Sequence, residues 1–177
     1  SSVREIVELA GVSKPALYYH FGSKEGLLAA ILEEAAGEFG QALDAAASSA
    51  GSARDRLHRC AEAFHSLIVE NVSVARVAHS VFTSPAEASP RFDFTVFDRH
   101  ARAAFGRIVA DGLAAGEIRP ADASDVALAV MGIAEAAAAR RLHPGFAPVE
   151  RADLRRALDL VFDGIFMPRV EQGELTS

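Results

Sequence analysis

The sequence predicts an all-α protein, and three observations support this. Turn and capping signals divide the chain into segments of helical length. Between them, apolar residues recur at helical spacing, as do Leu57, Ala61, Phe64 and Ile68 on one face. No stretch combines sustained period-two alternation with β-branched residues, as a half-buried strand would.

Composition limits the class of protein. The chain has 177 residues, 50% of them hydrophobic, and a formal net charge of −6. A single cysteine, Cys60, excludes an intrachain disulfide framework. No apolar run reaches the ~18 residues that span a bilayer, and no basic-then-apolar leader opens the chain, so we expect a cytoplasmic protein. The net negative charge argues against a protein that coats nucleic acid over its whole surface, but it allows a small local basic patch.

Two short helices are expected first. Ser2 and Glu5 form a capping box for a helix that Gly11 ends. Ser13 then caps a second helix over residues 13–20, with Pro15 in its first turn, where a missing N–H costs little.

A long helix should follow and run from Ser23, as its N-cap, to about Ala47. Residues 48–51 are small and read as a linker. Ser52 with Asp55 resembles another capping box, which opens the next helix.

Prolines, Gly116 and Asp122 divide the rest of the chain. They predict helices over residues 73–82, 91–115, 122–142 and 150–167.

The first two helices, joined by a tight turn that contains Gly11, have the layout of a helix-turn-helix. In that motif the second helix enters the major groove of DNA. Lys14, Tyr18, Tyr19 and His20 supply donors and aromatic edges suited to phosphates and thymine methyls. The alternative is an ordinary helical hairpin with solvated side chains, and spacing alone does not decide between the two.

The residues themselves favour the first interpretation. The distinctive run is Leu17, Tyr18, Tyr19, His20 and Phe21, followed by Ser23, Lys24, Glu25, Leu27 and Leu28. Over about residues 2–35 it closely resembles the DNA-binding region of the TetR family. The resemblance implies a homodimer that binds double-stranded operator DNA and releases it when a small molecule binds the C-terminal domain.

Carried over by position, the residues that would contact DNA are Arg4, Ser13, Lys14, Pro15, Ala16, Tyr18, Tyr19, His20 and Lys24. One departure is Val3, because many family members have Ser or Thr there, which puts one phosphate contact in doubt.

A second departure is larger. The family places a further helix before the helix-turn-helix, packed on its apolar side. Without it, Ile6, Leu9, Leu17 and Phe21 would be partly uncovered, so we expect the natural protein to be longer by about one helix and a tail.

The expected organisation is a DNA-binding head over residues 1–47 that lacks its first helix and includes the connecting helix from residue 24. An effector-binding and dimerisation domain follows over residues 48–169, with a frayed tail over 170–177.

An apolar pocket with a few polar anchors is expected in the second domain, on the strength of the resemblance. The candidates are His58, Glu62, Phe64, His65, His79, Phe82, Phe97 and His100. The alternative is plain core packing with histidines at the surface. His58, Glu62 and His65 share one helix face and could ligate zinc, although a solvated stripe or a pH-sensitive pocket wall is favoured. We expect no metal and no cofactor.

The last two helices are predicted to form a dimer interface. The candidates are Ala127, Val130, Ala134, Ala137, Leu154, Leu158, Val161, Phe162 and Ile165. The alternative is that both helices only complete the core of one chain.

The function predicted from these features is that of a ligand-responsive transcriptional regulator, a repressor released from its operator by a small apolar or amphipathic effector. An all-helical ligand-binding enzyme and a protein-binding adaptor are the alternatives. The sequence offers no nucleophile–base–orienter pattern and no glycine-rich phosphate loop, so we expect no enzyme.

Overall fold

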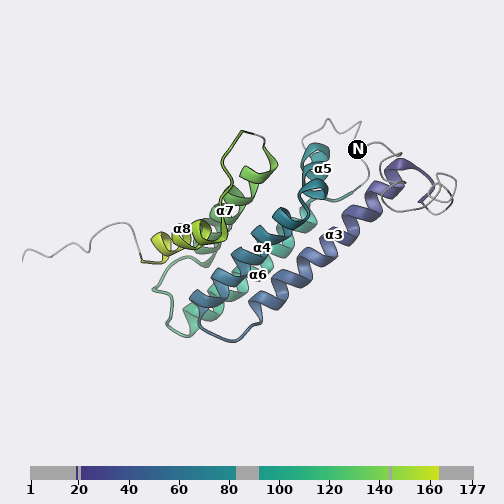
Figure 1. Ribbon diagram of the computed structural model, residues 1–177. Coiled ribbons are helices and arrows are strands. Elements are labelled where there is room, and N and C mark those ends of the chain that lie inside the picture. Colours follow the sequence, from purple (N-terminus) through teal and green to yellow (C-terminus); the bar gives the residue numbers. More distant parts are fainter. Residues whose placement is uncertain (1–18, 20, 83–91, 144, 164–177) are drawn as a thin grey trace, which may run out of the picture.

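The computed structural model describes residues 19, 21–82, 92–143 and 145–163 of the chain, and all regular structure in that part is helical (Figure 1). The helices are α3 (Lys24–Ala47), α4 (Ala53–Glu70), α5 (Val72–Phe82), α6 (Thr95–Ala114), α7 (Ala123–Leu142) and α8 (Arg151–Asp163). The predicted all-α fold is confirmed. None of the described helices is both long and apolar enough to cross a membrane.

Side-chain caps define where three helices begin, as predicted. The Ser23 hydroxyl accepts a hydrogen bond from the backbone N–H of Gly26 at 3.0 Å. Ser52 and Asp55 complete a capping box at the start of α4. The carboxylate of Asp122 accepts from two N–H groups in the first turn of α7. Each cap satisfies backbone donors that a helix start leaves without partners.

The start of α6 differs from the prediction, which placed it at residue 91. Phe92 and Asp93 are not helical, and the helix begins at Thr95. Asp93 Oδ1 accepts from the Thr95 backbone N–H at 3.0 Å and from its hydroxyl at 2.6 Å. A short polar side chain that bonds the backbone two residues on favours a turn over a helix, which delays the start of α6.

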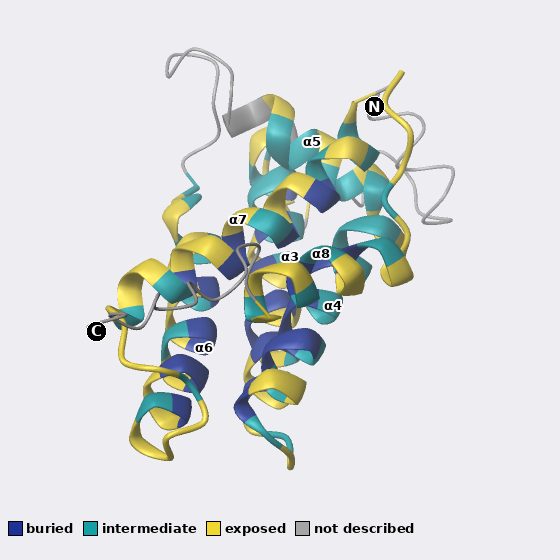
Figure 2. Cartoon of the chain, turned by 90° about the vertical axis from the view of Figure 1, so that its left-hand side faces the viewer, coloured by how far each residue is buried: buried dark blue, intermediate teal, exposed yellow. Residues whose placement is uncertain are grey.

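The hydrophobic core lies where α3, α4, α6 and α7 face one another. α3, α4 and α6 run alongside each other, and α8 packs against α4 and α7 (Figure 1). Leu43, Leu57, Phe105 and Val130 come from four different helices and are almost completely buried. Figure 2 shows buried residues on the facing sides of the helices and exposed residues on their outer sides. Burial of these apolar surfaces holds the helices together.

Candidate functional site

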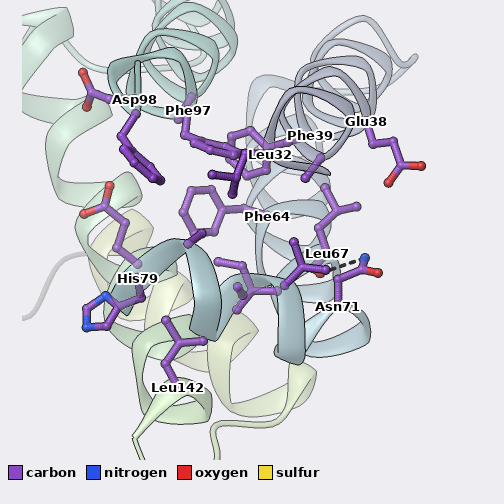
Figure 3. Close-up of a pocket in the computed structure, with 18 of the residues that line it drawn as sticks. Leu32, Glu38, Phe39, Phe64, Leu67, Asn71, His79, Phe97, Asp98 and Leu142 are labelled. Carbon is purple, nitrogen blue, oxygen red and sulfur yellow. Dashed lines mark hydrogen bonds between the residues drawn. The ribbon is translucent and has the colours of Figure 1, made fainter. Parts of the chain in front are cut away.

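A cavity of about 920 Å³ lies among α3, α4, α5, α6 and α7 (Figure 3). Its volume lies within the range of small-molecule sites. Most of its wall is apolar, formed by Ile31, Leu32, Ala35, Phe39, Phe64, Leu67, Ile68, Val74, Ala75, Ala78, Phe94, Phe97, Ala101 and Leu142. Because five helices contribute, a ligand in this cavity would contact almost every described element.

Phenylalanine rings form the centre of the wall. Phe39 on α3 meets Phe64 on α4 edge-on, with ring centroids 5.2 Å apart, and meets Phe97 on α6 at 5.5 Å. Edge-to-face pairs of this kind contribute about 0.5–1.5 kcal/mol beyond their burial. The three rings therefore tie three helices together at the cavity and keep part of its wall in place without a ligand.

Half of the polar residues in the wall are acidic. It consists of Glu34, Glu38, Asn71, His79, Thr95, Asp98, Arg102 and Glu135. Arg102 Nε donates to both oxygens of Asp98, at 3.0 and 2.8 Å. Burial raises the pKa of the Glu135 carboxyl, and the negative charge of Asp98 adds to that effect.

Three of the predicted pocket residues, Phe64, His79 and Phe97, line this cavity. His58, Glu62, His65 and His100 do not, and the Phe82 side chain lies outside the described part. α4 turns a different face to the cavity, the one with Phe64, Leu67, Ile68 and Asn71, and directs His58 and Glu62 toward α8.

Two residues of the stripe of His58, Glu62 and His65 hold α8 against α4. The His58 ring is 2% exposed, and its Nε2 lies 2.9 Å from Asp159 Oδ1. Glu62 forms an ion pair with Arg155 at 2.9 Å. His65 is also buried, and burial lowers its pKa. Among the described residues, no three metal-ligating side chains gather in one place. The structure thus contradicts both uses favoured for this stripe, a solvated face or a pocket wall, because its histidines are buried and none of its residues lines the cavity.

None of the pocket residues predicted from the sequence lies on α3. Ile31, Leu32, Ala35, Glu38 and Phe39 on that helix all line the cavity. Their spacing of three and four residues is that of one helix face, and it was a usable signal. α3 also begins at Lys24, directly after the predicted DNA-binding segment. One rigid element therefore connects that segment to the cavity.

Most of the predicted DNA-contacting residues lie outside the described part. These are Arg4, Ser13, Lys14, Pro15, Ala16, Tyr18 and His20, together with the side chain of Lys24. Tyr19 is described, and 85% of its surface is exposed. Phe21 is 41% exposed, and the other three apolar residues expected to be partly uncovered are not described.

Comparisons with known proteins show similarity both in the N-terminal sequence and in the fold. Residues 1–31 match the family of bacterial regulatory proteins called the tetR family. The fold is similar to that of the TetR family transcriptional regulator PfmR from Thermus thermophilus, with a TM-score of 0.71 and 26% identity over 94% of this chain and 90% of that one. The chain has the N-terminal signature and the fold of the TetR family.

Two further TetR-family structures support the same fold. A bacterial regulatory protein of the family from Rhodococcus RHA1 matches with a TM-score of 0.67 and 25% identity, over 92% of this chain and 85% of that one. A TetR/AcrR regulator from Thermobifida fusca has the same fold, with a TM-score of 0.67 and 22% identity over 94% and 88% of the two chains. No curated protein matched the sequence.

Burial within the single chain corrects the predicted dimer interface. Six of the predicted contact residues are buried inside the single chain: Ala127, Val130, Ala134, Ala137, Leu154 and Leu158. The small residues of α7 let it pack closely on its neighbours, so this face of the helix completes the core. Val161 is 40% exposed, Phe162 is half-buried and Ile165 is not described. The apolar side chains that α7 and α8 do expose include Leu128, at 58%, and Leu160, at 60%.

Proposed function

We propose that this chain is a ligand-responsive transcriptional regulator, a repressor that leaves its operator when a small apolar or amphipathic effector fills the cavity. The N-terminal signature and the TetR-family fold support DNA binding and transcriptional regulation. One observation carries the proposal further. α3 begins at Lys24, next to the DNA-binding signature, and its residues from Ile31 to Phe39 line the cavity.

Linkage supplies the mechanism. An effector shifts an equilibrium only by its difference in affinity for the two states. If the cavity accepts the effector only when α3 has moved, the effector favours a position of the DNA-binding head that fits the operator poorly. Binding of effector and of DNA then weaken each other by the same factor.

The direct test is a gel shift with the natural promoter DNA. Lys14→Ala and Tyr19→Ala should each weaken operator binding, because they remove side chains from the proposed DNA contacts. Arg119→Ala is a matched control, since Arg119 is an exposed cation in the loop between α6 and α7, at the other end of the molecule from the start of α3 (Figure 1). Unchanged operator affinity in both Lys14→Ala and Tyr19→Ala would refute the role of this segment.

The same experiment separates the regulator from its two alternatives. DNA binding by charged contacts weakens steeply with salt, because phosphate neutralisation releases counterions. An all-helical enzyme or a protein-binding adaptor would show no salt-dependent shift of promoter DNA that depends on Lys14 and Tyr19.

We also propose that the chain acts as a homodimer in the cytoplasm. Two half-sites one turn of DNA apart, about 34–36 Å, require two heads held together. Leu128 on α7 and Leu160 and Val161 on α8 support this arrangement, because they are exposed apolar side chains on two neighbouring helices. A second copy of the chain would remove them from water.

A further inference from the structure

We propose that the effector is an organic cation, a molecule with an apolar body and at least one ammonium-type group. This inference rests on the proposed function, because it takes the cavity to be the effector site. It adds the sign of the ligand's charge, which neither the family signature nor the fold specifies.

The charges that line the cavity are strongly unbalanced. Four carboxylates, those of Glu34, Glu38, Asp98 and Glu135, face one guanidinium, that of Arg102. Arg102 already forms an ion pair with Asp98, in which its Nε lies 2.8 Å from Asp98 Oδ2. Within the described part of the chain, Glu34, Glu38 and Glu135 have no ion-pair partner. These carboxylates are exposed to solvent, so the open edge of the cavity carries an excess of negative charge around an apolar interior.

Glu135 on α7 is the carboxylate that a cation would help most. Although Glu135 is exposed on one side, its partial burial and the negative Asp98 both disfavour its charged form, and the positive Arg102 opposes them. A positive group beside Glu135 would offset both effects at once. A carboxylate or phosphate in the same place would add a further negative charge and lose its own hydration.

The apolar wall is also suited to a cation. Aromatic faces attract ammonium groups, and the effect is larger where water is excluded. Phe64 and Phe97 stand at the centre of the cavity, with Asp98 on one side of them and Glu38 on the other (Figure 3). The volume of about 920 Å³ leaves room for an apolar body between rings and carboxylates.

The test compares three probes with the same ten-carbon chain and different heads: decyltrimethylammonium, decanol and decanoate. Each is titrated into the full chain below its micelle concentration, and heat or displacement of an apolar dye is measured. We expect the ammonium probe to bind about tenfold or more tightly than decanoate, since opposite charges attract and like charges repel near a surface of low polarity. Decanol should fall between them, and salt should reduce the spread.

Two variants locate the charge effect. Glu135→Gln and Glu38→Gln should each weaken binding of decyltrimethylammonium by about threefold to tenfold, while decanol binding stays the same. The neutral probe shows that the cavity is still formed in each variant. Glu33→Gln is the matched control, because Glu33 is an exposed carboxylate on α3 that does not line the cavity. It should change none of the three affinities.

Some outcomes overturn the cation preference alone. Decanoate binding as tightly as the ammonium probe would do so, and so would equal ammonium binding in wild type, Glu135→Gln and Glu38→Gln. If decanoate then also released operator DNA, the effector site of the proposed function would stand while its predicted charge was wrong.

Failure of the proposed function, with the charge preference intact, would give a different result. Glutamate-dependent binding of decyltrimethylammonium that left the operator complex intact would overturn the regulatory role of the cavity and keep its charge preference. No binding by any of the three probes would overturn the cation preference. The predicted DNA-binding head would then be tested separately, by operator binding of the unliganded protein.

Discussion

The ring of His100 on α6 packs against the backbone of α3 at Gly40. A Cβ placed on Gly40 would lie 2.7 Å from His100 Cε1 and 2.8 Å from Nδ1, closer than any ordinary contact. Only a residue without a side chain lets the two helices meet this closely. Because α3 links the predicted DNA-binding head to the cavity, this contact helps to determine where α3 lies.

Gly40→Ala should therefore destabilise the protein by about 1–3 kcal/mol, because the added methyl group must displace the His100 ring or separate the helices. Gly37→Ala is the matched control on the same helix, since nothing lies within 4 Å of its added Cβ. That variant should gain up to about 1 kcal/mol from the higher helix propensity of alanine. Urea denaturation followed by circular dichroism measures both.

A double variant identifies the cause. Adding His100→Ala to Gly40→Ala removes the clash, so the combined loss should be smaller than the sum of the two single losses. Simple additivity in this cycle would show that His100 is not what restricts position 40.

Acid should loosen the contact between α4 and α8. Hydrogen bonds from Arg54 hold the pKa values of Asp159 and Asp163 below their usual range, and His58 adds to the effect at Asp159. Because these folded pKa values are depressed, their stabilising contribution is complete above the unfolded pKa near 4 and is lost as pH falls through the lower, folded values.

Comparing pH 7 with pH 3 in urea denaturation tests this. The double variant Asp159→Asn with Asp163→Asn should be less stable than wild type at pH 7 and should lose less stability on acidification. Glu33→Gln serves as the control for loss of an exposed carboxylate. If the double variant and wild type lose equal stability, the Arg54 contacts contribute nothing that depends on pH.

The thiol of Cys60 should be inert in the folded protein. It is fully buried, and burial raises its pKa to about 12, so almost no reactive thiolate forms near neutral pH. Alkylation by iodoacetamide at pH 8 should be slow in buffer and fast in urea, with the slow rate following global unfolding. Fast labelling of the folded chain, read by mass spectrometry, would contradict this tight packing.

The proposed dimer should depend on the exposed side chains of α7 and α8. Leu128→Glu together with Leu160→Glu should shift the protein toward monomer in sedimentation, because two charges would be placed in an apolar contact. Phe146→Glu is a suitable control, since Phe146 is also 58% exposed but lies in the loop before α8, under the guanidinium of Arg140. An unchanged sedimentation coefficient in the Leu128 and Leu160 variant would exclude this surface.

Local signals in the sequence were enough to place most helix boundaries. Ser23, Ser52 and Asp122 each cap a helix through atoms no more than three residues away, and Gly116 follows the end of α6 with a φ of +71°. Such interactions depend on neighbouring residues, so the sequence displays them directly. The family signature at the N-terminus is equally local, since it is a contiguous run over residues 1–31.

Only the tertiary structure decided which face of each helix meets which neighbour. His58 turned toward Asp159 on α8, 101 residues away along the chain, and away from the cavity. Val130 and Leu154 entered the core of the single chain, and Glu135 joined carboxylates from α3 and α6 around the cavity. A helical repeat defines an apolar face but not its partner, because the partner depends on how several helices can fill one core together. The sequence by itself thus determined the helices and the family signature, while packing between distant segments decided the cavity and its charge.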